Sequence, residues 1–72
     1  MPHLRKEIEV CFAAIRVAEE IARRKRVDKE ELGSYIVITR NFMRDARFKN
    51  KEYRVEQKLA ARLQALEHHI RN

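Results

Sequence analysis

The first third of the chain carries an apolar pattern that an α-helix places on one side. Between residues 4 and 22, apolar residues are separated by four, three, four, three and four positions. They are Leu4, Ile8, Cys11, Ile15, Ala18 and Ala22. Residues three and four apart lie on the same helix face, and Pro2 suits a first helical turn. The pattern therefore predicts a helix over about residues 3–25.

A second apolar stripe runs beside the first on the same predicted helix. It consists of Val10, Ala14, Val17 and Ile21. At about 100° per residue the two stripes together cover about half of the helix circumference, which is wider than the band of an ordinary surface helix. We expect the first helix to be either central in its own fold or shared with a partner. The four residues of the second stripe are the predicted partner-binding residues.

The next segment begins with a helix-start signal. Asp28 is a candidate N-cap, and Glu31 follows three residues later, as in a capping box. Apolar residues at helical spacing then predict a helix over about residues 29–47. The β-branched and aromatic run at residues 35–39 would favour a strand, but the helical spacing continues through it and no second strand is available for pairing. Gly33 weakens this helix by up to about 1 kcal/mol relative to alanine.

A third apolar stripe predicts a last helix over about residues 51–70. It consists of Val55, Leu59, Leu63, Leu66 and Ile70. This stripe is out of phase with the preceding one by about two residues, so we expect a turn near residue 50, with Asn50 as the cap. Short connections favour antiparallel neighbours. The predicted fold is a single all-α domain over residues 1–72, a small three-helix bundle that runs up, down and up.

One alternative arrangement of the same helices stays open. In it the second and third helices form one continuous helix, and the molecule dimerises through the first. Both arrangements are all-α. An all-β fold is disfavoured because it needs many turns, whereas the 72 residues include one glycine and one proline.

Positive charge is concentrated in the second half of the chain. The net charge is +6, and residues 37–72 hold nine basic and four acidic residues. Seven of the basic residues are predicted to line the second and third helices, where they could follow a phosphate backbone. They are Arg40, Arg44, Arg47, Lys51, Arg54, Lys58 and Arg62. The competing interpretations are a solvated face whose long side chains cover apolar edges, and a surface for an acidic protein.

The sequence shows no catalytic, cofactor or metal-binding constellation, so we expect neither an enzyme nor a bound cofactor or metal. Cys11 lies in the main apolar stripe and is expected to be a small buried residue. The histidines are near the termini, and no pair shares a helix face. The basic run Arg23–Arg26 is expected to end the first helix, where cations are favoured.

The sequence favours a non-enzymatic helical protein-interaction module that acts within a larger assembly and binds a protein partner or a second copy. The alternative is a basic nucleic-acid-binding domain that contacts phosphates through the seven cations. A single cysteine fits a reducing compartment, so we expect an intracellular protein of the cytoplasm or nucleus. No apolar run approaches the ~20 residues that span a bilayer, so a membrane is not an expected partner.

Overall fold

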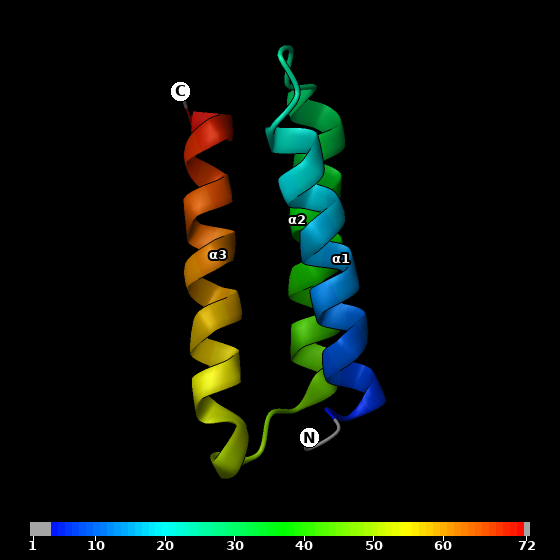
Figure 1. Cartoon of the computed structure of the whole chain (residues 1–72), viewed down its shortest axis with the longest axis vertical. Helices are drawn as coiled ribbons and strands as arrows, with labels where there is room; N and C mark the ends of the chain where they lie inside the picture. Colours follow the sequence, from blue (N-terminus) through cyan, green and yellow to red (C-terminus); the bar gives the residue numbers. More distant parts are fainter. Residues whose placement is uncertain (1–3, 72) are drawn as a thin grey trace.

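The computed structural model describes residues 4–71, which form three α-helices. The helices are α1 (Lys6–Ala22), α2 (Lys29–Ala46) and α3 (Tyr53–Arg71), and the short 3-10 turn η1 (Asn50–Glu52) precedes α3. No strand occurs within residues 4–71. The chain ascends in α1, descends in α2 and ascends again in α3 (Figure 1). These observations confirm the predicted all-α bundle with its up-down-up order.

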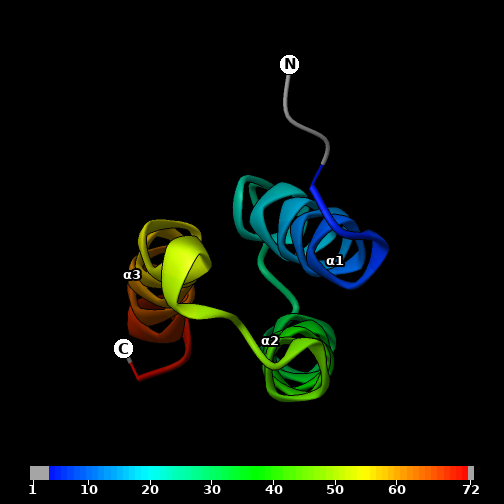
Figure 2. The same cartoon turned by 90° about the horizontal axis from the view of Figure 1, so that it is seen from below.

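The three helices are arranged as a triangle. Seen from the end of the bundle, each helix occupies one corner and contacts both of the others (Figure 2). The chain turns back between α2 and α3, so the alternative with one continuous second helix is wrong. The shift of about two residues between the apolar stripes of α2 and α3 predicted this turn correctly, because one straight helix could not direct both of these stripes toward α1.

Local signals define the connection between α1 and α2. The Asp28 carboxylate accepts hydrogen bonds from the backbone N–H groups of Glu30 (3.0 Å) and Glu31 (3.1 Å), which confirms the predicted cap. For the helix before it, the predicted start at residue 3 and the Pro2 signal lie outside the described residues. This helix is shorter than the predicted range of residues 3–25, because α1 begins at Lys6 and ends at Ala22. The basic run Arg23–Arg26 therefore lies in the connection and is exposed. The chain uses these residues to reverse its direction before the Asp28 cap.

The turn into α3 differs from the prediction in its cap. Asn50 begins η1, and the preceding Lys49 has extended backbone angles. The Glu52 carboxylate accepts a hydrogen bond of 2.8 Å from the backbone N–H of Lys49. Arg47 follows α2 with a φ of 48°, in the left-handed region that commonly ends a helix. The prediction of a turn near residue 50 is correct. The prediction that Asn50 caps it is wrong, because the Glu52 carboxylate accepts the hydrogen bond of the free N–H of Lys49.

The core consists of the apolar faces of all three helices. Its buried members are Ile8, Cys11, Ala14, Ile15, Ala18, Ile21, Leu32, Ile36, Ala46, Leu59, Leu63 and Leu66. Cys11 is fully buried, as predicted, and burial raises the pKa of its thiol. Thr39 is also fully buried, and its hydroxyl donates a hydrogen bond of 2.7 Å to the carbonyl of Tyr35. The buried polar atom is therefore satisfied within α2.

Candidate interaction surfaces

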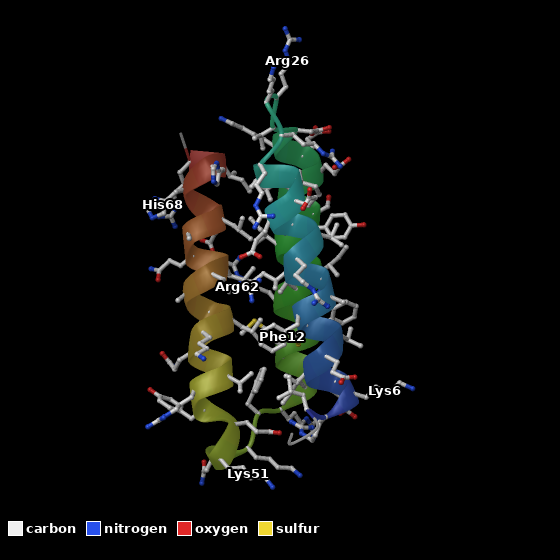
Figure 3. All side chains as sticks on the ribbon, viewed as in Figure 1. Lys6, Phe12, Arg26, Lys51, Arg62 and His68 are labelled. Atoms are coloured by element: carbon white, nitrogen blue, oxygen red, sulfur yellow. The ribbon has the colours of Figure 1, made fainter. Side chains whose placement is uncertain are left out.

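The partners of Arg62 identify the side of α1 that faces α3. The Arg62 side chain donates a 2.8 Å hydrogen bond to the Glu19 carboxylate and lies over the Phe12 ring, 5.7 Å from its centroid. Figure 3 shows Phe12 and Arg62 between α1 and α3. Val10 precedes Phe12 by two positions, and Val17 precedes Glu19 by two positions. Two positions correspond to about 200° around a helix. Val10 and Val17 therefore lie on the side of α1 away from α3.

The same reasoning applies to α2. Arg40 forms an ion pair with Glu67 of α3, and Val37 lines the same α2–α3 groove. Ile38 and Phe42 are each two positions from Arg40, so they lie on the opposite side of α2. That side borders α1.

We call the side of α1 and α2 that carries these residues the α1–α2 face. It contains Val10 (38% exposed), Val17 (42%), Ile38 (37%) and Phe42 (37%). All four are large apolar side chains that the monomer leaves in contact with solvent. The surface extends over two neighbouring helices, and α3 packs on the other side of the bundle.

The structure separates the four predicted partner-binding residues into two pairs. Val10 and Val17 are exposed, whereas Ala14 and Ile21 are buried in the core of the monomer. The physical reason is that α2 packs against one edge of the second stripe and covers it. Ile38 and Phe42 were not predicted as binding residues. In the sequence they could be recognised as two apolar residues four positions apart, which places them on one side of the helix beside the buried stripe of α2.

The predicted basic stripe does not form one continuous surface. Arg40 pairs with Glu67 across the α2–α3 contact, and Arg62 pairs with Glu19 across the α1–α3 contact. The Arg62 guanidinium lowers the pKa of the Glu19 carboxyl. Lys58 precedes Arg62 by four residues and therefore shares its flank of α3. The stripe is divided between the two flanks of α3.

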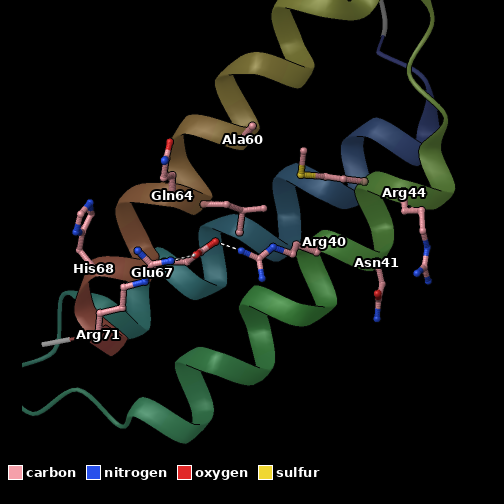
Figure 4. A pocket seen from close by; sticks show the side chains of 10 residues that line it. Arg40, Asn41, Arg44, Ala60, Gln64, Glu67, His68 and Arg71 are labelled. Carbon is pink, nitrogen blue, oxygen red and sulfur yellow. Dashed lines mark ion pairs between the residues drawn. The ribbon is translucent and has the colours of Figure 1, made fainter.

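The α2–α3 groove contains part of the basic set. Arg40 and Arg44 of α2 line it together with residues of α3. Figure 4 shows Arg40 and Arg71 directed at the Glu67 carboxylate, which lies between them. The Arg71–Glu67 distance is 3.7 Å. An acidic side chain at this place lowers the positive potential that a phosphate would meet.

The remaining members of the predicted stripe lie near the end of the bundle where α2 connects to α3. Arg47 occupies the left-handed position after α2, and Lys51 lies in η1 at the bottom of the view in Figure 3. Arg54 follows in the first turn of α3. All three side chains are exposed. They can contact a charged partner without breaking an interhelical ion pair described above.

Nothing in the sequence indicated the ion-pair cluster that forms around Arg5. The Arg5 guanidinium donates two hydrogen bonds of 2.8 Å to the Glu52 carboxylate and one of 2.9 Å to the carbonyl of Ala46. It thereby connects the beginning of α1, the end of α2 and the turn before α3. The hydrogen bonds from Arg5, followed by that from the Lys49 N–H, lower the pKa of Glu52 from its ordinary value of 4.5 to about 2.

Residues 4–71 contain no group of three or more His, Cys, Asp or Glu side chains placed to hold a metal ion. Within the same residues, none of the helices is both long enough and apolar enough to cross a membrane. The chain matches no protein-family model, no curated protein and no solved structure. The proposal for its function therefore depends on the surfaces of the bundle itself.

Proposed function

We propose that this protein is a non-enzymatic helical protein-interaction module that acts within a larger assembly and binds its partner through the α1–α2 face. The observation that carries the proposal is the exposure of Val10, Val17, Ile38 and Phe42 on one side of two adjacent helices. Single exposed apolar residues are ordinary on a protein surface, but a group of large ones on one surface is typical of an interaction site.

The shape of this face suits a helical partner. Two antiparallel helices lie side by side. Val10 and Val17 are seven positions apart on α1, and Ile38 and Phe42 are four positions apart on α2. A further helix packing along them would complete a four-helix arrangement, in which side chains of one helix fit between those of its neighbours. Cys11, the single cysteine of the chain, supports an intracellular setting, where thiols stay reduced.

The proposal is tested by photo-cross-linking in cells that express the protein. A photoreactive phenylalanine analogue is placed at position 38 in one variant and at position 37 in a control variant. Val37 is 53% exposed but lines the α2–α3 groove. We expect position 38 to yield a cross-linked protein, identified by mass spectrometry, and position 37 to yield much less. Absence of a cross-link at position 38, with the folded protein present, would contradict the proposal.

Nucleic-acid binding is the second candidate function. It is supported by the net charge of +6 and by the exposed cations Arg44, Arg47, Lys51, Arg54 and Lys58. Phosphate contacts by such residues supply affinity without requiring base-specific side chains. The interhelical ion pairs of Arg40 and Arg62 remove two of the seven predicted contacts from this surface, so we rank this function second.

A further inference from the structure

Both helices of the α1–α2 face have an apolar centre and charged ends. On α1 the outward stripe, with spacings of four and three residues, is Lys6, Val10, Ala13, Val17 and Glu20, and the basic residue Arg24 follows in the connection after the helix. On α2 the corresponding stripe is Glu31, Tyr35, Ile38, Phe42 and Asp45. The α1 stripe begins with the basic Lys6 and ends with the acidic Glu20, which the basic Arg24 follows, whereas both end residues of the α2 stripe, Glu31 and Asp45, are acidic. Lys6 points away from α3 in Figure 3, as this assignment requires.

The two stripes are aligned along the bundle axis by contacts at both ends. At one end, an Arg24 side-chain nitrogen lies 2.8 Å from a Glu31 carboxylate oxygen. At the other end, Arg5 donates its hydrogen bond to the carbonyl of Ala46. Lys6 is therefore level with the Asp45 end of α2, and the apolar centres of the two stripes lie at the same height.

A symmetric dimer that keeps the helices of both copies aligned has two possible arrangements through this face, because its two-fold axis lies in the plane of the interface and runs either across or along the helices. When the axis runs across the helices, α1 of one copy packs antiparallel against α1 of the other, and α2 packs antiparallel against α2 in the same way. Glu31 of one copy then faces Asp45 of the other, so like charges meet at both ends of the paired α2 helices. With the axis along the helices, α1 of each copy meets α2 of the other. Lys6 of one copy then faces Asp45 of the other, so opposite charges meet.

We propose that a second copy of this chain covers the α1–α2 face, with α1 of each copy packed antiparallel against α2 of the other. This inference rests on the proposed function and specifies its partner. The dimer has a core of four helices, each antiparallel to both neighbours, with Val10, Val17, Ile38 and Phe42 from each copy in its centre. Lys6 of each copy lies beside Asp45 of the other.

The size of the face indicates how strong the association is. A helix of this length spans about 25 Å, and two helices are about 20 Å wide, which gives about 500 Å² per copy. The total of about 1,000 Å² is near the lower limit for a specific interface. We therefore expect a micromolar dissociation constant, and added salt should weaken the dimer because its charged ends are exposed.

The first experiment measures the mass of the purified chain by sedimentation equilibrium from about 1 to about 500 µM, a range that brackets micromolar dissociation constants. We expect the mass to rise from that of one chain to that of two. Ile38→Glu should remain at the mass of one chain throughout, and Val37→Glu, the matched control on the other side of α2, should associate like the wild type. Val17→Glu tests the same face from α1, and circular dichroism verifies that each variant is folded.

The second experiment tests the relative orientation of the copies. Lys6→Glu and Asp45→Lys should each weaken association several-fold, because each places like charges together at two symmetry-related contacts at one end of the dimer. The variant that carries both changes should recover the wild-type dissociation constant. Recovery supports the proposed axis, because the other arrangement does not bring these two residues together.

The outcomes distinguish this inference from the proposed function. A wild-type mass of one chain at the highest concentration overturns the dimer, whereas a cross-link from position 38 to a different protein would still support an interaction module. A dimer that Val37→Glu disrupts and Ile38→Glu does not would show that another face is used, which also overturns the inference. A dimer that depends on Ile38 but shows no recovery in the double variant overturns the proposed orientation.

Discussion

Replacement of Gly33 by alanine is expected to stabilise the protein by about 1 kcal/mol. Gly33 is the single glycine of the chain, and it lies within α2 without a positive φ. Glycine loses more backbone entropy than alanine when it is fixed in a helix. The substitution therefore removes a cost without requiring an unfavourable backbone conformation.

The surroundings of Gly33 decide whether this gain is realised. A Cβ atom at position 33 would lie 3.6 Å from Cδ1 of Ile70 on α3, an ordinary van der Waals distance. The added methyl group fits between the helices without displacing Ile70, and its new contacts add at most a few tenths of a kcal/mol. For a domain of this size, 1 kcal/mol corresponds to a rise in Tm of about 4–8 °C.

Thermal and urea denaturation followed by far-UV circular dichroism measure the effect. The same substitution in an Ile70→Ala background is the control, and the gain should agree in both backgrounds within about 0.5 kcal/mol, because backbone entropy supplies most of it. A decrease in Tm would refute the reasoning. It would show that α3 approaches α2 too closely for a methyl group or that position 33 is not helical.

Three further predictions concern the ion-pair cluster, the buried thiol and the basic residues. Because Arg5 lowers the pKa of Glu52 to about 2, the stability that this carboxylate supplies is present above its unfolded pKa and is lost as the pH falls from about 4.5 toward 2. Glu52→Gln should therefore flatten the dependence of the unfolding free energy on pH between these values. An unchanged slope would contradict the assignment. Cys11 should react slowly with a thiol reagent in native buffer and rapidly in denaturant, because it is buried and its pKa is raised; equal rates would place it on the surface. If the second candidate function is correct, the double variant Arg44→Glu, Lys58→Glu should weaken binding to mixed-sequence DNA or RNA and reduce its salt dependence, whereas absence of wild-type binding at low salt would exclude that function.

The sequence by itself determined the helices and most of their inward faces. Spacings of three and four residues fix which side chains share a helix face, and this relation depends only on the geometry of one helix. Asp28 could be identified as a cap for the same reason, since its hydrogen bonds reach only two and three residues along the chain. The antiparallel order followed from short connections, which leave adjacent helices little choice of neighbour.

Tertiary structure decided which apolar and charged residues are available to a partner. Val17 and Ile21 belong to the same stripe of α1, yet only Val17 is exposed, because α2 covers one edge of that stripe. The bond from Arg5 to Glu52 joins residues 47 positions apart, and that from Arg62 to Glu19 joins residues 43 apart. Helical spacing assigns each residue to a side of its own helix, but the neighbour on that side is set only when the three helices pack together.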